Sequence, residues 1–240
     1  YDNCTITVTD TSTNTVTLNI SSFVVDATTP WSQQSYVKAA NSDNDSNFGA
    51  SVSISVDTIA VGATGEDSNQ ATITNSTSAS SNNDNSTSGA VYVYDRSGSS
   101  WAQDAYIKAA NSDSSDLFGT SVSIDVDTIA VGATGEDSYQ TTITNGMTAS
   151  ANANDNTSNS GAAYVYKRYG NFWVQEAYIK AVNNDASDSF GTSVSIDGDT
   201  LAVSAVGEDS HQTTITMTNA DNTTASASDN TSASGAVYVY

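Results

Sequence analysis

The chain repeats one pattern of about seventy residues three times between Trp31 and Tyr240. Each copy opens at a tryptophan, passes through a Lys-Ala-Ala-Asn or Lys-Ala-Val-Asn segment and a Phe-Gly strand, and closes with Tyr-Val-Tyr. The copies span residues 31–100, 101–172 and 173–240, and residues 1–30 lie outside them. A fixed period of this length predicts supersecondary units that bury their cores against one another.

Each copy has the pattern of four short β-strands. Val52 and Ile54 alternate with serines, which predicts a strand with one apolar face. In the next segment Ala60 and Gly62 lie opposite larger aliphatic residues, so both faces must be covered and another backbone must come close. The Tyr-Val-Tyr strand alternates aromatic and aliphatic side chains, and the segment from tryptophan to lysine is the fourth strand. Helical periodicity is absent, so we expect an all-β fold of three four-stranded antiparallel blades.

These motifs resemble the FG-GAP repeat of bacterial cell-surface and secreted proteins, which is related to the blades of the integrin α-subunit β-propeller. The similarity covers residues 31–240, where Phe-Gly, the Ala-Val-Gly-Ala or Ala-Val-Ser-Ala strand, the aromatic strand and the tryptophan recur in order. The resemblance implies a blade whose outermost strand is encoded at the start of the next copy. It therefore implies that the Trp31 strand belongs to a blade that the third copy leaves unfinished.

The sequence departs from such propellers in two respects. Three blades are fewer than usual, and closing them into a ring would need about 120° per blade, so a closed ring is an alternative and not the favoured arrangement. Each copy also carries a Ser/Thr/Asn-rich insertion, at residues 69–88, 139–160 and 211–234. We expect each insertion to form a short extra strand followed by a solvated loop.

Residues 1–30 predict a β-strand pair or hairpin, which is a candidate donor for strand exchange. Residues 5–9 and 15–21 alternate apolar and polar side chains on either side of a turn-like segment. An unpaired edge is a template for strand addition, and head-to-tail addition that does not close makes a filament. The alternative is that the Trp31 strand closes the chain's own ring. The expected assembly residues are Ile6, Val8, Val16, Leu18, Ile20, Trp31, Tyr238 and Tyr240.

One pattern of charges recurs with the repeat. Lysines stand directly before the Ala-Ala-Asn or Ala-Val-Asn segment, and glutamates stand in a Gly-Glu-Asp-Ser corner. We expect each lysine to meet an acidic corner between strands and to fix their register, with independent solvated charges as the alternative. The residues are Lys38, Lys108, Lys180, Glu66, Glu136 and Glu208.

Asp and Asn side chains gather in the turn before each Phe-Gly. Oxygen ligands at short spacing suit Ca²⁺, but the same residues favour turns, and the loops lack the Asp-x-Asp-x-Asp-Gly pattern of integrin calcium sites. Turn capping is the favoured interpretation, and calcium is the alternative. The candidate calcium ligands are Asp43, Asp45, Asp113, Asp116, Asp185 and Asp188.

Asn-X-Ser/Thr triplets mark candidate sites of N-glycosylation. Five of them lie in the long polar loops, where a glycan would not disturb packing. The candidate asparagines are Asn3, Asn19, Asn44, Asn75, Asn85, Asn156, Asn222 and Asn230.

Composition excludes several functional classes. The 27 acidic and 6 basic residues give a net charge of −21, which argues against nucleic acid or an anionic membrane as a partner. No stretch reaches the roughly 18–20 apolar residues of a membrane helix, so membrane insertion is not expected. Cys4 is the only cysteine and His211 the only histidine, which excludes an internal disulfide and leaves no second histidine for a conventional triad. We expect a protein that is not an enzyme.

The sequence therefore predicts an extracellular or cell-surface structural protein whose glycosylated copies exchange β-strands head to tail to build a fibre or surface layer. Its expected partners are copies of itself, and calcium is the one candidate cofactor. The alternative is a monomeric adhesion propeller whose long loops contact a carbohydrate or a surface protein. Further copies of the repeat beyond Tyr240 would favour this alternative.

Overall fold

A computed structural model describes residues 4–9, 15–20, 31–147, 155–212 and 232–240 of the chain. The chain forms two compact units, Tyr1–Tyr36 and Val37–Tyr240. Every regular element among the described residues is a β-strand or a turn, and none is a helix long and apolar enough to cross a membrane. The all-β prediction is confirmed.

The first unit contains one β-hairpin. Its strands β1 (Cys4–Thr9) and β2 (Thr15–Ile20) pair antiparallel. The register places Ile6 opposite Leu18 and Val8 opposite Val16. The predicted N-terminal hairpin is therefore present, with its two strands paired to each other.

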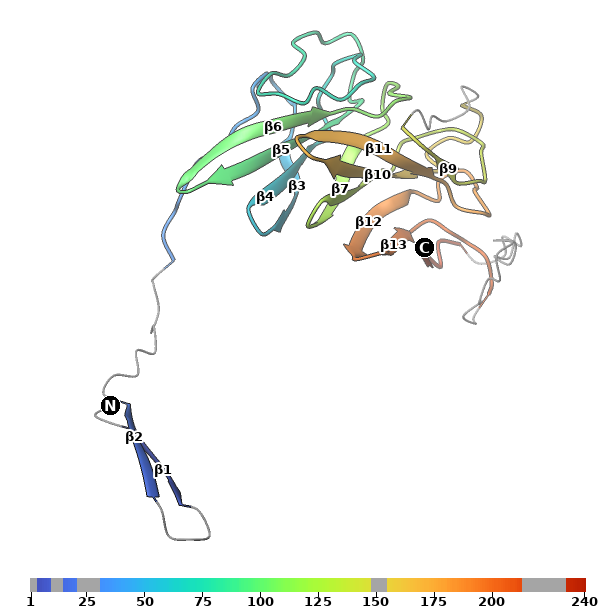
Figure 1. The fold of residues 1–240 in the computed structure, drawn as a ribbon. Coiled ribbons are helices and arrows are strands. Elements are labelled where there is room, and N and C mark those ends of the chain that lie inside the picture. Colours follow the sequence, from blue (N-terminus) through green and yellow to red (C-terminus); the bar gives the residue numbers. More distant parts are fainter. Residues whose placement is uncertain (1–3, 10–14, 21–30, 148–154, 213–231) are drawn as a thin grey trace. The chain divides into compact units, whose positions relative to one another are not determined.

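The second unit contains three antiparallel sheets, which we call blades 1, 2 and 3 (Figure 1). Blade 1 has the strand order β3 (Phe48–Ser55), β4 (Thr58–Ala63), β5 (Ala90–Ser97) and β6 (Ser100–Ile107). Blade 2 has the order β7 (Phe118–Asp125), β8 (Thr128–Ala133), β10 (Ala162–Tyr169), β11 (Phe172–Ile179) and β9 (Thr144–Asn145). Blade 3 has the order β12 (Phe190–Asp197), β13 (Thr200–Ala205) and β14 (Ala236–Val239).

The outer strand of each complete blade comes from the following copy of the repeat. Strand β6 opens the second copy and completes blade 1, and β11 opens the third copy and completes the four repeated strands of blade 2. This is the arrangement that the resemblance implied. Among the described residues, β14 of blade 3 pairs with β13 alone, so this blade has three strands.

Blade 2 has one strand more than the expected four because its insertion also contributes. Strand β9 is the short extra strand predicted for the second insertion, and it pairs with β11. In the first insertion Thr74 and Tyr106 exchange two backbone hydrogen bonds of 2.8 and 2.9 Å at the equivalent place. Most of the third insertion lies outside the described residues.

Consecutive blades approach one another so closely that glycine is required at their joints. Strand β3 packs against β7, and β7 packs against β12, so blade 2 lies between blades 1 and 3 (Figure 1). A Cβ atom on Gly62 would lie 2.1 Å from the carbonyl oxygen of Gly119, and one on Gly132 would lie 1.9 Å from that of Gly191. The predicted close approach of another backbone is therefore present at both joints. The equivalent position in blade 3 is Ser204.

Blades 1 and 3 expose apolar side chains whose equivalents in another blade are buried. Ile54 in blade 1 is 61% exposed, whereas Ile124 in blade 2 is 6% exposed. Val237 in blade 3 is 67% exposed, whereas Val91 in blade 1 is fully buried. The apolar face that sequence alternation predicts is therefore covered only where a neighbouring blade packs against it.

Candidate functional site at the blade joints

Two of the three repeated lysines are buried between consecutive blades. The ammonium of Lys108 donates to Oε2 of Glu66 at 2.9 Å and to Oγ of Ser88 at 2.7 Å. In the next joint Lys180 donates to Glu136 and Ser160, at 2.7 Å each. Both lysine side chains are fully buried. Desolvation lowers their pKa from the ordinary value, and the adjacent glutamate opposes that shift.

Each buried lysine links two copies of the repeat. The Lys108 ammonium reaches back to Glu66 in blade 1, while its carbonyl oxygen accepts a hydrogen bond of 3.5 Å from the Tyr166 hydroxyl in blade 2. Lys180 spans blades 2 and 3 in the same way, because its carbonyl oxygen accepts from the Tyr240 hydroxyl at 3.5 Å. The lysine therefore fixes where one blade begins relative to the blade before it.

Each glutamate is also held by an asparagine of its own copy. Asn111 donates to Oε1 of Glu136 at 3.1 Å, and its own carbonyl oxygen accepts from the Tyr164 hydroxyl at 2.9 Å. Burial raises the pKa of Tyr164 well above its ordinary value, so this hydroxyl remains a neutral donor. The same arrangement holds Glu66 and Glu208.

The third lysine and the third glutamate do not meet. Lys38 is exposed, whereas Glu208 is 4% exposed. Among the described residues, no cationic side chain lies within 4.0 Å of the Glu208 carboxylate. Each buried lysine pairs with the glutamate of the preceding copy. Lys38 of the first copy and Glu208 of the third copy therefore have no partner of this kind among the described residues.

Sequence reasoning missed the serine that shares the lysine. Ser88 and Ser160 are fully buried, and each hydroxyl also contacts the carbonyl oxygens of the neighbouring glutamate corner at 3.1–3.4 Å. The sequence offers one indication of this serine: a Ser-Gly pair stands directly before the aromatic strand in every copy. Its role depends on contacts between copies, which a repeat pattern does not show.

Two of the aspartates proposed as calcium ligands accept hydrogen bonds within their own turns. The carboxylate of Asp116 accepts from the Asp113 backbone N–H at 2.8 Å, and that of Asp188 accepts from the Asp185 N–H at 3.1 Å. In the first copy the equivalent residue of this turn is Ser46, whose hydroxyl donates to the Asp43 carbonyl oxygen at 3.2 Å. In the part of the chain that the structure describes, no three acidic, His or Cys side chains form a group that could hold a metal. These carboxylate contacts agree with turn capping, and calcium binding at these turns stays a prediction.

Burial has a further effect on these carboxyl groups. It raises the pKa of Asp116 to about 8 and that of Asp188 to about 6. Nearby carboxylates, Glu136 for Asp116 and Glu208 for Asp188, raise both values further. Near neutral pH these turns therefore hold carboxyl groups that ionise at an unusual cost.

The candidate glycosylation sites fall into two groups where the structure describes their side chains. The side chains of Asn44 and Asn156 are exposed and make no hydrogen bond among the described residues. Asn75 exchanges hydrogen bonds of 2.7 and 3.2 Å with the backbone of Trp173, and Asn85 bonds Ser112 and Ser114. Asn19 lies in β2, and Asn3, Asn222 and Asn230 lie outside the described residues.

The predicted assembly residues have different surroundings. Trp31 is exposed and belongs to no strand. Tyr238 and Tyr240 pack edge-on against Phe190, with ring centroids 5.3 and 6.4 Å apart, so they belong to the core of blade 3. The remaining residues, Ile6, Val8, Val16, Leu18 and Ile20, lie in the β1–β2 hairpin.

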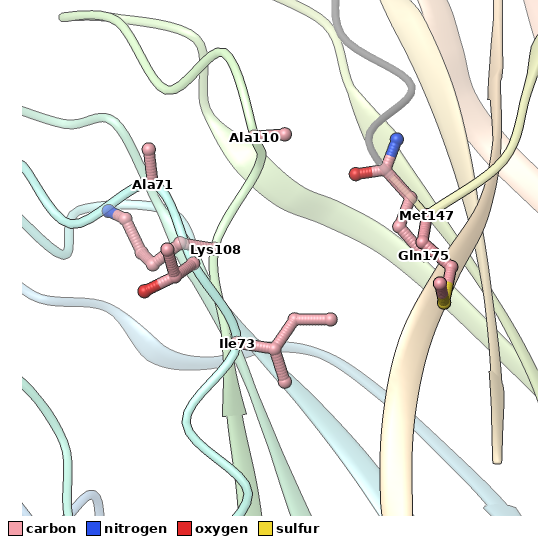
Figure 2. Close-up of a pocket in the computed structure, with 7 residues that line it drawn as sticks. Ala71, Ile73, Lys108, Ala110, Met147 and Gln175 are labelled. Carbon is pink, nitrogen blue, oxygen red and sulfur yellow. The ribbon is translucent and has the colours of Figure 1, made fainter. Parts of the chain in front are cut away.

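One open pocket lies beside the first joint (Figure 2). It is bordered by the first insertion, by Met147 of the second insertion and by β11. Its lining offers apolar, amide and hydroxyl groups, with no carboxylate, imidazole or thiol, and the ammonium of the lining residue Lys108 is engaged by Glu66 and Ser88. The lining residues are Ala71, Thr72, Ile73, Lys108, Ala110, Met147 and Gln175. This pocket therefore lacks the paired groups of acid–base or nucleophilic catalysis.

The family model of the FG-GAP repeat matches residues 31–94, 101–166 and 173–215. The chain belongs to the FG-GAP repeat family. The matches coincide with the three copies, and the FG-GAP assignment agrees with the blades of β-propeller type described above. FG-GAP repeat proteins are typically extracellular or cell-surface proteins that are not enzymes and often act in adhesion or ligand binding. A search of curated proteins gave no match.

Proposed function

We propose that this FG-GAP repeat protein is an extracellular, non-enzymatic structural protein whose copies join head to tail by β-strand exchange into a fibre or surface layer. One observation carries the proposal. Among the described residues, blade 3 has three strands, and the segment that begins at Trp31 repeats the sequence of the outer strands β6 and β11 without being part of any sheet. An open sheet edge and a segment with the sequence of the strand that completes such an edge elsewhere are the two halves of a strand-exchange joint.

The exposed apolar side chains of blades 1 and 3 support the same function. Apolar side chains at Ile54 and Val237 occupy positions that neighbouring blades cover inside the chain. Solvent-exposed apolar positions that are buried in equivalent repeats are typical of surfaces that meet another molecule. The net charge of −21 and the proposed glycans at the exposed Asn44 and Asn156 would keep such a β-rich surface soluble before assembly.

Truncation tests this function. Negative-stain electron microscopy and light scattering would compare the full chain with variants lacking residues 1–30 and residues 1–36. We expect filaments from the full chain, and we expect them to disappear when residues 1–36 are removed. Loss already on removal of residues 1–30 would assign the donor to the hairpin, whereas a monomeric full chain would overturn the proposal.

A monomeric adhesion or ligand-binding protein is the second candidate. The pocket of Figure 2 and the long polar loops support it, because apolar surface and amide groups beside solvated loops suit a carbohydrate or peptide ligand. Ligand-observed NMR with a panel of oligosaccharides would test it. Saturation transfer that disappears in Met147→Asp would favour this function, and its absence across the panel would count against it. Calcium binding remains a separate proposal, to be tested by calorimetry with the full chain.

A further inference from the structure

We propose that residues Tyr36–Lys38 of a second copy of this chain complete blade 3 as its outer strand, with the Lys38 ammonium seated against Glu208. The inference rests on the proposed head-to-tail assembly and names its specificity-determining pair. It commits to a second copy because, among the described residues, the exposed Lys38 belongs to blade 1 and the buried Glu208 to blade 3, and neither makes an ion pair there.

Blade 3 already holds the groups that surround the ammonium in the other two blades; we call Glu208, Asn183 and Ser234 the lysine seat of blade 3. Oε1 of Glu208 accepts from Asn183 at 2.8 Å, as Glu136 accepts from Asn111. The Ser234 hydroxyl bonds the carbonyl oxygens of Glu208 and Ser210 at 3.1 and 3.0 Å, as the serines of the other two seats do. The one part missing among the described residues is the ammonium.

The lysine seat of blade 3 is open to solvent on the side of Ser234. Ser88 and Ser160 are fully buried beneath their lysines, whereas Ser234 is exposed. Glu208 itself remains 4% exposed. A buried carboxylate without a cation is costly, so a lysine that enters this seat is favoured.

The backbone of Lys38 is held by blade 1 in the same way as the backbones of Lys108 and Lys180 are held by blades 2 and 3. Its carbonyl oxygen accepts from the Tyr94 hydroxyl at 2.9 Å, as that of Lys108 accepts from Tyr166. Its side chain is exposed. Because Lys38 is anchored to blade 1 and blade 2 lies between blades 1 and 3, its own Glu208 is out of reach (Figure 1).

The register of the joint follows from the two complete blades. Tyr92 lies opposite Tyr106 and Val91 opposite Ile107, and blade 2 repeats this pairing. The same register places Tyr36 of the second copy opposite Tyr238, with Val37 opposite Val237. In blade 2 the Tyr178 hydroxyl lies 2.7 Å from the Ser138 hydroxyl, so the Tyr36 hydroxyl is expected beside Ser210.

Ser204 makes the joint between copies different from the joints within a chain. Gly62 and Gly132 leave no room for a Cβ atom because the next blade lies against them, and Ser204 occupies the equivalent position in blade 3. The inner strands of two copies therefore cannot approach as closely as β4 approaches β7. The outer strand and the lysine–glutamate pair must hold the joint.

Complementation between two variants tests the pair. Lys38→Met removes the donor charge and leaves Glu208 intact, and Glu208→Gln neutralises the acceptor without changing its shape. We expect each variant alone to assemble at concentrations at least about tenfold higher than the wild type, which corresponds to about 1.4 kcal/mol. Mixed together, they should form a one-to-one heterodimer that grows no further, because each supplies the half that the other lacks. Lys167→Met and Glu176→Gln are matched charge controls that should assemble like the wild type.

Light scattering and native mass spectrometry distinguish the outcomes. If both variants assemble as well as the wild type, the proposed contact between Lys38 and Glu208 is wrong, while assembly by strand exchange is not contradicted. Variants that weaken assembly but give no heterodimer also overturn the pair as a contact between copies. A closed dimer of the wild type that depends on both residues supports the pair and contradicts the fibre. A wild type that stays monomeric overturns both.

Discussion

The Lys108 ammonium lies 2.9 Å from the Glu66 carboxylate, although the two residues belong to different copies of the repeat. Both side chains are almost completely removed from solvent. A buried ion pair adds little net stability, but the loss of one partner leaves the other charge buried and unpaired. The pair therefore makes the joint intolerant of change at either residue.

Lys108→Met should destabilise the protein by about 3–5 kcal/mol, because Glu66 would remain buried without its cation. Urea unfolding monitored by tryptophan fluorescence would measure the change. Lys38→Met is the matched control, since the Lys38 side chain is exposed, and it should leave the stability of the monomer unchanged. Equal stability of the two variants would contradict a structural role for the buried pair.

Asp116 should make stability depend on pH. Burial raises its pKa to about 8 from 3.8, so between these values the folded state binds more protons than the unfolded state. Its contribution to stability is fully present below about pH 4 and is lost as the pH rises toward 8. Its loss lowers the free energy of unfolding by up to about 1.4 kcal/mol per pH unit.

Asp116→Ser, which installs the residue that the first copy has at Ser46, should flatten this dependence. Urea unfolding at pH 5 and pH 8 would compare the variant with the wild type. Asp199→Ser changes an exposed carboxylate and should leave the slope as it is. An unchanged slope in Asp116→Ser would show that Asp116 is ionised in the folded state at both pH values.

Gly62→Ser should open the joint between blades 1 and 2. The new Cβ atom would lie 2.1 Å from a backbone oxygen of Gly119, which cannot move without displacing β7. We expect a loss of at least about 1–3 kcal/mol, measured by thermal unfolding. The reverse change at the equivalent place, Ser204→Gly, meets no clash and should cost only about 1 kcal/mol, from strand entropy and from the hydrogen bond that the Ser193 N–H donates to the Ser204 hydroxyl at 3.0 Å. Similar losses in both variants would show that blade packing does not set the requirement for glycine.

Glycan occupancy should differ among the candidate asparagines if the protein is secreted through a glycosylating pathway. Asn44 and Asn156 are exposed, whereas the amides of Asn75 and Asn85 are engaged by backbone and hydroxyl partners. Peptide mapping by mass spectrometry should therefore find glycans at Asn44 and Asn156 more often than at Asn75 and Asn85. High occupancy at Asn75 would show that modification precedes its packing against Trp173.

Most of the fold could be predicted from local pattern. Alternation in residues such as Val91 and Tyr92 predicts a strand covered on both faces, and the similar start of the three insertions predicts the short insertion strand. The exposure of Ile54 could not be predicted, since the same alternation is buried at Ile124. Whether an apolar face is covered depends on whether another blade stands beside it, and that is not a property of the strand.

The sequence by itself determined the number of copies, the strands within each copy and the residue types that recur at each position, because these follow from periodicity over a few residues. The tertiary structure decided which lysine meets which glutamate. Lys108 and Glu66 are 42 residues apart and face each other only because β6 of the second copy completes the first blade. The same rule of pairing with the preceding copy leaves Lys38 and Glu208 without an ion pair among the described residues. For that reason Lys38 is exposed whereas Lys108 and Lys180 are buried, although each copy supplies the same lysine.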